Sequence, residues 1–135
     1  MNVIIVGCGK VGYTLAETLS NEGHDITVVD NNPQKLEGLA NSIDVQCVQG
    51  NGASYRVLKE AGVGQCDLVI AATSGDEINM LCCLIARKAG HCRTIARVRG
   101  PDCYEDLNFI QDDLGLSMAI NPEFSAATAC YHLIR

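Results

Sequence analysis

The glycine-rich hexamer Gly7-Cys8-Gly9-Lys10-Val11-Gly12 constrains the fold of this chain more than any other segment. Before it stands Val3-Ile4-Ile5-Val6, a β-branched run typical of a strand that is buried on both faces. After it, apolar residues recur at helical spacing, at Val11, Leu15, Ala16 and Leu19. A GxGxxG string by itself also occurs in ordinary turns, but here it joins a predicted strand to a predicted helix. The segment therefore predicts a strand–turn–helix unit.

Each glycine of the hexamer has a distinct role in such a unit. Gly7 permits the tight turn, and Gly9 lets the backbone approach a pyrophosphate because no Cβ stands in the way. Gly12 allows the helix to pack closely on the strand. The exposed N–H groups of the helix, together with the positive end of its dipole, then face the phosphates. The hexamer thus predicts a phosphate-binding turn.

A second predicted strand, Ile26-Thr27-Val28-Val29, ends in Asp30, eighteen residues after Gly12. A dinucleotide-binding fold holds the ribose hydroxyls with an acid about 20 residues beyond its glycines. The alternative interpretation of Asp30 is a surface acid that follows a strand. As a ribose ligand, Asp30 repels a 2′-phosphate, so NAD(H) is expected to bind better than NADP(H), although Lys35 would soften this preference. ATP and ADP present the same adenosine ribose, and the sequence does not separate them from NAD(H).

Composition and charge narrow the class of protein. The chain has 135 residues and is 47% hydrophobic, which is enough for one compact domain with its own core. Its apolar runs fall short of the roughly 18 residues of a membrane span, and no basic region precedes the first of them. The formal net charge of −6, with scattered basic residues, argues against nucleic acid as a partner. We expect a cytoplasmic protein that does not insert into the membrane.

The cysteines and histidines do not predict a metal or catalytic centre. Eight cysteines are many for this length, yet the sequence contains no C-x-x-C pair, and its three histidines are far apart. Adjacent residues of a helix point about 100° apart, so Cys82-Cys83 is a poor chelate. Reduced cysteines acting as small buried hydrophobes are the expected alternative. We therefore expect no metal site and no catalytic residue.

Strand and helix patterns alternate along the whole chain. Further strands are predicted at residues 45–48, 67–72, 93–98 and 116–120, and helices are predicted to follow Asn32-Pro33, Ser54, Ser74, Pro101 and Asn121-Pro122. Such alternation predicts an α/β, Rossmann-like, doubly wound and mostly parallel six-stranded sheet with helices on both faces. The fold uses the entire chain, and no segment remains for a substrate domain. This organisation favours a binding domain over an enzyme.

Other candidate ligand contacts lie at the carboxyl ends of the predicted strands, the edge at which such sheets bind ligands. Asn51-Gly52 follows the third strand, with an ordinary Asn-Gly turn as the alternative. Thr73 and Ser74 follow the fourth strand, although Ser74-Gly75-Asp76-Glu77 also has the spacing of a capping box. Arg97 ends the fifth strand, where its guanidinium either reaches the pyrophosphate or is a surface group.

The segments Met1 to Asp30, 48–52, 72–80 and 95–102, and the helix start at Asn121-Pro122-Glu123, together resemble the N-terminal RCK (KTN) domain of TrkA-type potassium-uptake regulators. The resemblance implies a cytoplasmic regulatory subunit that binds NAD(H), or ATP or ADP. It also implies assembly into a homodimer or larger ring beneath a membrane-embedded potassium transporter or channel, and hence a location at the inner face of the plasma membrane. The nucleotide site that it implies comprises Gly7, Cys8, Gly9, Lys10, Val11, Gly12, Asp30, Asn51, Gly52, Thr73, Ser74 and Arg97. An NAD-binding domain excised from an oxidoreductase is the alternative function.

The resemblance also divides the chain. Residues 1–121 correspond to the nucleotide-binding domain, and residues 122–135 to a crossover or hinge helix that leads to a C-terminal region not present in this sequence. An apolar stripe on this last helix is formed by Phe124, Ala127, Tyr131 and Ile134. We expect the stripe to pack on a second copy of the chain, and the alternative is that it folds back on its own domain.

Overall fold

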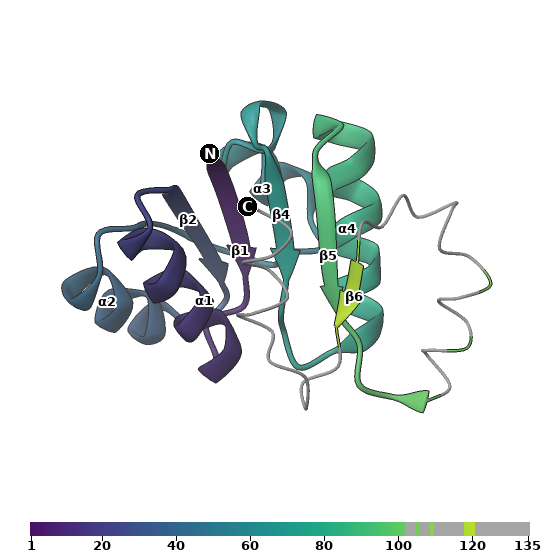
Figure 1. Ribbon diagram of the computed structural model, residues 1–135, viewed down its shortest axis with the longest axis horizontal. Helices are drawn as coiled ribbons and strands as arrows, with labels where there is room; N and C mark the ends of the chain where they lie inside the picture. Colours follow the sequence, from purple (N-terminus) through teal and green to yellow (C-terminus); the bar gives the residue numbers. More distant parts are fainter. Residues whose placement is uncertain (102–104, 106–108, 110–117, 121–135) are drawn as a thin grey trace.

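The predicted alternation of strands and helices is present in the computed structural model, which describes residues 1–101, 105, 109 and 118–120 (Figure 1). The first half of the chain contains β1 (Asn2–Val6), α1 (Lys10–Asn21), β2 (Asp25–Asp30), α2 (Pro33–Ser42) and β3 (Gln46–Gln49). The second half contains α3 (Tyr55–Glu60), the short 3₁₀ helix η1 (Val63–Gln65), β4 (Leu68–Ala71), α4 (Asp76–Gly90), β5 (Arg93–Arg97) and β6 (Met118–Ile120).

The strands form a parallel sheet in the order β3-β2-β1-β4-β5-β6. Five of these strands lie in the continuous stretch 1–101, and β6 is a three-residue strand that pairs with the end of β5. The chain winds outward from β1 in one direction to β3 and then returns to β4 on the other side of β1. The carboxyl ends of β1 and β4 therefore meet at the point where the winding reverses, as a doubly wound fold requires. The predicted Rossmann-like class is confirmed.

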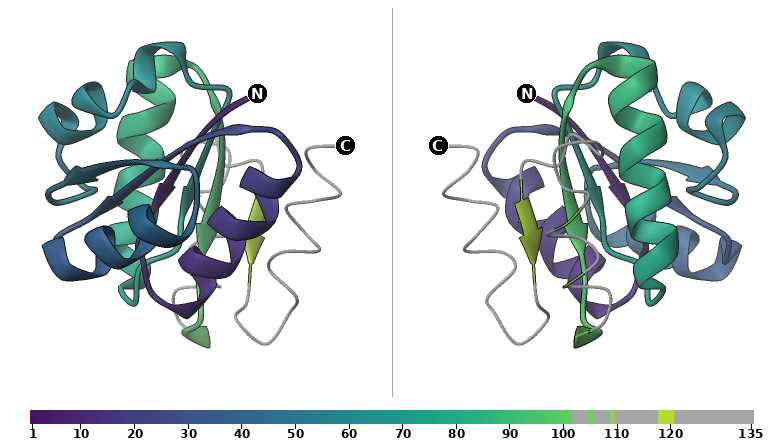
Figure 2. Two further views of the ribbon diagram at one scale, coloured as in Figure 1. Left: turned by 90° about the vertical axis from the view of Figure 1, so that its left-hand side faces the viewer. Right: turned by 90° about the vertical axis from the view of Figure 1, so that its right-hand side faces the viewer.

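Helices cover both faces of the sheet (Figure 2). On one face Val3 and Ile5 of β1 pack with Leu15 and Leu19 of α1 and with Leu39 of α2. On the other face Ile4 and Val6 pack with residues of α3 and α4, among them Leu58, Cys83 and Ala86. Successive strand residues thus enter opposite cores, which explains why β1 is apolar without interruption.

Local sequence signals set the starts of α2 and α3. The side chain of Asn32 accepts hydrogen bonds from the N–H groups of Gln34 and Lys35 at 3.0 and 3.2 Å, and Pro33 occupies the first turn. Ser54 caps α3 in the same way through the N–H of Val57. These two predicted starts are confirmed.

The predicted capping box at the start of α4 is wrong. Its N-cap residue is Gly75 rather than Ser74, and the N-cap residue makes no side-chain hydrogen bond to the first turn of the helix. The hydroxyl of the neighbouring Thr73 accepts the N–H of Gly75 at 3.2 Å and so orders the loop that leads into α4. Ser74 is exposed.

Several expectations fall on residues that are not described. The helix predicted after Pro101 lies outside the described residues except at the single positions Glu105 and Phe109. The described residues also exclude the helix predicted after Asn121-Pro122, the division at residue 121 and the apolar stripe of Phe124, Ala127, Tyr131 and Ile134. Among the helices that the structure does describe, none has the length and apolar character that crossing a bilayer requires.

The cysteines within the described residues are free thiols, and five of the six are buried: Cys8, Cys66, Cys82, Cys83 and Cys92. Cys82 and Cys83 belong to the core beneath α4 and are 0% exposed, so their predicted role as small hydrophobes is confirmed. Burial raises the pKa of Cys82 to about 12. Within the described part of the chain no group of three His, Cys, Asp or Glu side chains is arranged to hold a metal ion.

Candidate nucleotide-binding cleft

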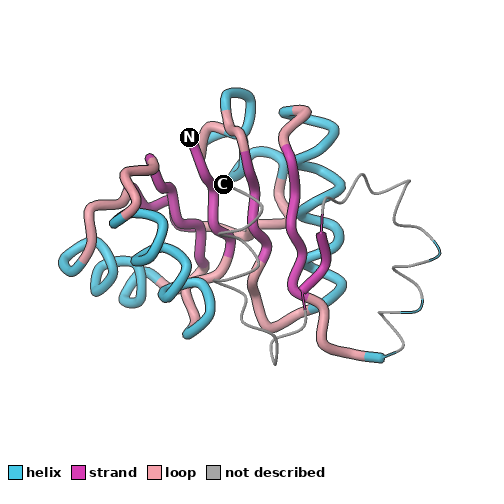
Figure 3. The backbone as a smooth tube through the Cα atoms, viewed as in Figure 1, coloured by secondary structure: helices cyan, strands magenta, loops and turns pink. Residues whose placement is uncertain are grey.

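A cleft of about 400 Å³ lies at the carboxyl edge of the sheet. The loops that follow β1, β2, β3, β4 and β5 start from this edge (Figure 3). Eight of the twelve residues predicted from the sequence line it: Gly7, Gly9, Asp30, Asn51, Gly52, Thr73, Ser74 and Arg97. They come from five separate segments of the chain that the sheet brings to one edge. His24 lies at the opposite edge, where it lines a separate hollow of about 600 Å³.

The glycine loop is shaped by backbone contacts that exclude side chains. Gly7 has a φ of +109°, and a Cβ on it would lie 2.8 Å from the carbonyl oxygen of Ala72 at the end of β4. Its own N–H donates to the carbonyl of Val29 at 2.8 Å, which ties the loop to β2. A Cβ on Gly12 would overlap the carbonyl oxygen of Gly7. The predicted roles of Gly7 in the turn and of Gly12 in helix packing are confirmed.

Gly9 differs from its two neighbours because the protein itself does not require a glycine there. A Cβ on Gly9 would meet no described atom within 4 Å, and its φ of −77° is open to any residue. Gly9 is also the N-cap of α1 and provides no side-chain hydrogen bond to the helix. The helix α1 therefore starts at the edge of the cleft without a capping side chain, an arrangement suited to an anion.

Asp30 joins the glycine loop to the start of α2. One carboxylate oxygen accepts the N–H of Cys8 at 2.7 Å, and the other accepts the N–H of Asn32 at 2.8 Å. Each carboxylate oxygen has two lone-pair sites, so both can still accept a hydroxyl. The side chain is half-buried and lines the cleft. Asp30 therefore organises the backbone of the loop and can also contact a ligand.

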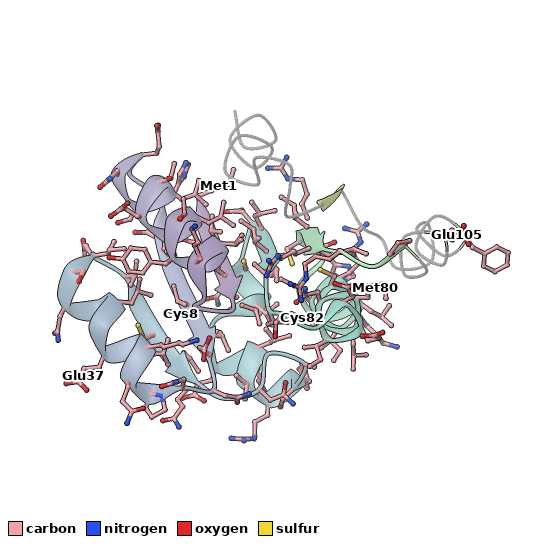
Figure 4. The ribbon with its side chains drawn as sticks, turned by 90° about the horizontal axis from the view of Figure 1, so that it is seen from below. Met1, Cys8, Glu37, Met80, Cys82 and Glu105 are labelled. Atoms are coloured by element: carbon pink, nitrogen blue, oxygen red, sulfur yellow. The ribbon has the colours of Figure 1, made fainter. Side chains whose placement is uncertain are left out.

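The remaining four predicted residues do not line the cleft. Cys8 and Lys10 line a neighbouring hollow of about 510 Å³ between α1 and α2. Cys8, labelled in Figure 4, points its thiol toward the carbonyl of Lys35, and burial followed by the charge of Asp30 raises its pKa. Lys10 is exposed at the start of α1. Val11 and Gly12 lie behind the loop, where Gly12 supports Gly7.

The turn after β3 serves both as a turn and as a wall of the cleft. Asn51 closes the turn because its side-chain oxygen accepts the N–H of Ala53 at 2.9 Å. A Cβ on Gly52 would overlap the side chain of Val6, so the turn packs directly against the end of β1. The two interpretations that the sequence left open are therefore compatible.

The loop after β4 is held by Asn79, a residue of α4 that is 0% exposed. The Oδ1 atom of Asn79 accepts the backbone N–H of Thr73 at 2.9 Å and its hydroxyl at 2.6 Å. The Nδ2 atom donates to the carbonyls of Thr73 at 3.1 Å and Arg97 at 2.8 Å. The hydroxyl, the N–H and the carbonyl of Thr73 are thus all engaged within the protein, and Asn79 fixes Thr73 as part of the cleft wall.

Among the described residues, the Nε of Arg97 is the only buried side-chain polar atom that lacks a hydrogen-bond partner. Its Nη1 donates to the carbonyl of Thr73 at a long 3.4 Å. Burial, and then the charge of Arg99, lowers the pKa of Arg97, while Asp76 opposes this effect. The Nε is itself buried, but Arg97 lines the cleft, and a guanidinium at this edge is suited to an anionic partner.

A second set of contacts, which we call the clasp, ties the chain after β5 to the start of α4. The carboxylate of Asp76 accepts the N–H groups of Arg99 at 3.1 Å and Gly100 at 2.8 Å. The guanidinium of Arg99 donates to the carbonyl of Ser74 at 2.6 Å. The clasp fixes the exit of β5 beside the cleft.

Asn79 and Ile78 were not predicted from the sequence as functional residues, and Lys35 was named only as a residue that softens the ligand preference set by Asp30. Lys35 and Ile78 line the cleft, and Asn79 supports its wall from behind. A signal for Asn79 exists, because it is a polar residue at helical spacing with Cys82, Cys83 and Ala86 on the buried face of α4. An amide on such a face needs partners for all its polar atoms.

These features define a class of protein: a Rossmann-like domain with a glycine loop, an acid at the end of β2 and a cleft at the switch point of the sheet. The family model described as the TrkA-N domain matches residues 3–122. This chain belongs to the TrkA-N domain family. The resemblance drawn from the sequence is thereby confirmed.

Curated relatives are similar over most of this chain. A Trk system potassium uptake protein TrkA homolog of Methanothermobacter thermautotrophicus is 37% identical over 127 residues, which are 94% of this chain and 57% of that protein. The Trk system potassium uptake protein TrkA of Haemophilus influenzae is 40% identical over 126 residues, which are 91% of this chain and 28% of that protein. The chain thus spans less than two thirds of the length of each relative.

Solved structures share the fold. The TrkA-N domain of the inner membrane protein ybaL from Escherichia coli has a TM-score of 0.80 at 21% identity, covering 99% of this chain and 96% of that chain. The GsuK channel bound to NAD has a TM-score of 0.74 at 24% identity over 88% of this chain and 21% of that chain. GsuK bound to ADP has a TM-score of 0.73 at 24% identity over 89% of this chain and 31% of that chain.

Proposed function

We propose that this chain is a nucleotide-sensing regulatory domain of a potassium uptake system, and that it is not an enzyme. The observation that carries the proposal is the open space at Gly9, beside the uncapped start of α1, in a cleft that Arg97 also lines. A polar, positively polarised cleft of this kind fits the phosphates of NAD(H) or an adenine nucleotide. The names of the relatives supply the transport system.

In the proposed complex the ligand crosses the cleft from Asp30 to Arg97. The adenosine ribose lies against the carboxylate of Asp30, and Asn51 and Gly52 flank the adenine. The phosphates lie over Gly9 at the start of α1, within reach of Arg97, and the backbone at Thr73 and Ser74 lines the centre of the cleft. The charge of Asp30 then favours NAD(H) over NADP(H), because NADP(H) brings a 2′-phosphate to that position. Solved structures of GsuK bound to NAD and to ADP support this ligand class.

The proposed output is a change in conformation that a partner senses. We place the nucleotide-binding unit at residues 1–121 and a crossover or hinge helix at residues 122–135, which would join this unit to a second copy and to a further region. A homodimer or ring would lie at the inner face of the plasma membrane beneath a potassium transporter or channel. Coupling between ligand and partner in such systems typically amounts to about 1–3 kcal/mol.

A competition titration tests the ligand class. The 135-residue chain is titrated by calorimetry with NADH, NAD, ATP, ADP and NADPH under one buffer and salt condition. We expect saturable binding of NADH or of an adenine nucleotide, with NADPH bound at least about tenfold more weakly than NADH, a difference of about 1.4 kcal/mol. Equal binding of NADPH would contradict the role of Asp30. Absence of binding by all five compounds would refute the proposed function.

A further inference from the structure

Asn79 is the most completely bonded polar side chain near the cleft. Its amide makes all four hydrogen bonds that a primary amide can make, and the side chain is 0% exposed. Its partners belong to two segments that are distant in sequence: Thr73, in the loop after β4, and Arg97, at the end of β5. Asn79 therefore fixes these two segments relative to each other.

The partner atoms of Asn79 are backbone atoms at the rim of the cleft. Asn79 donates to the carbonyl of Arg97 at 2.8 Å and to that of Thr73 at 3.1 Å. The Thr73 carbonyl also accepts the Arg97 guanidinium, at 3.4 Å, so one carbonyl receives donors from both side chains. Because of this shared acceptor, the position of Asn79 affects where the guanidinium of Arg97 points.

Asn79 does not itself line the cleft, whereas Thr73 and Arg97 do. It lies on α4 between the cleft wall and the core that contains Cys82 and Cys83. An apolar side chain of similar size would pack against this core, but it would leave the Thr73 and Arg97 carbonyls without the amide donor. Core packing alone therefore does not account for an amide at this position.

We propose that Asn79 is a positioning residue for nucleotide binding, acting through Arg97. Its amide holds the end of β5 against the loop after β4, so that the guanidinium stands in the cleft before a ligand arrives. The inference rests on the proposed function, since it assumes that Arg97 contacts the phosphates. It adds a residue that touches no ligand and nevertheless sets the affinity for it.

A double-mutant cycle in the 135-residue chain tests this role. Asn79→Asp is nearly isosteric, keeps acceptors for the N–H and hydroxyl of Thr73, and removes both amide donors. Asn79→Ala serves as a second variant, in case Asn79→Asp does not fold. Each is made in the wild-type and Arg97→Ala backgrounds, and the dissociation constants for NADH and ADP are measured by calorimetry. Cys82→Ala is the control, because Cys82 is equally buried on α4 but takes no part in these hydrogen bonds.

We expect Asn79→Asp to weaken NADH binding about tenfold in the wild-type background and by less than about twofold in the Arg97→Ala background. Cys82→Ala should lower the urea midpoint while leaving the affinity within about twofold of wild type. An equal loss in both backgrounds would show a general structural effect and overturn the inference, as would unchanged affinity in a folded Asn79 variant. If the wild-type chain binds neither NADH nor ADP, the proposed function fails first and this inference fails with it.

Discussion

Replacing glycines of the hexamer one at a time separates the part of the loop that serves the fold from the part proposed to serve the ligand. Gly9→Ala adds a Cβ that meets no described atom within 4 Å, at a backbone φ of −77°. Gly12→Ala adds a Cβ that overlaps the Gly7 carbonyl oxygen and lies 2.8 Å from its carbon. The same chemical change is therefore harmless to the protein at one position and sterically excluded at the other.

The Gly12 variant should be less stable than the Gly9 variant by about 1–3 kcal/mol or more. At Gly9, alanine is a poorer N-cap than glycine by a few tenths of a kcal/mol or more, while the less flexible unfolded chain offsets about 0.4–1 kcal/mol. The net change should stay within about 0.5 kcal/mol. At Gly12 the backbone of α1 must move away from the loop, and overpacking of this kind costs about 1–3 kcal/mol or more. Gly64→Ala, which also meets nothing within 4 Å but lies in η1 away from the cleft, is the matched control.

Urea unfolding of the free chain and NADH titration together decide the outcome. We expect Gly9→Ala to keep the unfolding free energy of the wild type and to bind NADH at least about tenfold more weakly, because the methyl group fills the space proposed for the phosphates. Gly64→Ala should keep both properties. If Gly9→Ala destabilises the chain as strongly as Gly12→Ala, the steric reasoning is wrong. If it binds NADH as the wild type does, the phosphates do not lie over Gly9.

Four further predictions concern charge, thiols and assembly. Asp30→Asn should lower the free energy of unfolding by about 1–2 kcal/mol, since one of two backbone N–H groups loses its acceptor. It should also narrow the preference for NADH over NADPH, and an unchanged urea midpoint would contradict the stability prediction. Lys10→Ala should stabilise the free chain by about 0.5 kcal/mol, because a cation at the start of α1 opposes the helix dipole. The same change should weaken NADH binding. A less stable chain with unchanged affinity would show that Lys10 has a structural role. The pKa of Cys82 is about 12 in the folded chain, so the unfolded state binds fewer protons above about pH 8.5 and stability falls as pH rises. In urea unfolding between pH 8 and pH 10, Cys82→Ala should reduce this fall in unfolding free energy by about 1.4 kcal/mol per pH unit. If the unfolding free energy of wild type and variant changes equally with pH, the raised pKa of Cys82 is wrong. Deleting residues 122–135 should give monomers in sedimentation velocity, whereas a 135-residue chain that is already monomeric at high concentration would refute the crossover helix.

The backbone of the site was predictable because the residues that shape it act locally. Gly12 is required by its contact with the carbonyl of Gly7, five residues earlier in the chain, and Gly7 is required by its positive φ within the turn. Asn32-Pro33 starts α2 for an equally local reason, since a cap bonds to the N–H groups two and three residues ahead. Spacing in the sequence therefore carries this information directly.

The distribution of hydrogen bonds among polar side chains was not predictable in the same way. Ser74 has the correct spacing for a cap, but α4 begins after Gly75, and the Thr73 hydroxyl, which bonds to Asn79 and to the N–H of Gly75, orders the preceding loop. The bond from Asn79 to the carbonyl of Arg97 spans eighteen residues and forms only after β4 and β5 pair. Such competition among neighbours is decided by the tertiary structure, which spacing alone does not encode.

The strand order has a mechanical consequence for the domain. The halves β3-β2-β1 and β4-β5 meet along a single seam, where Val3 pairs with Leu68 and Val6 pairs with Ala71. Asp30 stands on one side of this seam and Arg97 on the other, at its carboxyl end. A ligand that contacts both side chains would connect the two halves of the sheet. A force that separates the halves would then act on the ligand contacts as well as on the pairing of β1 with β4. The stiffness of the whole sheet would therefore depend on whether a ligand occupies the cleft.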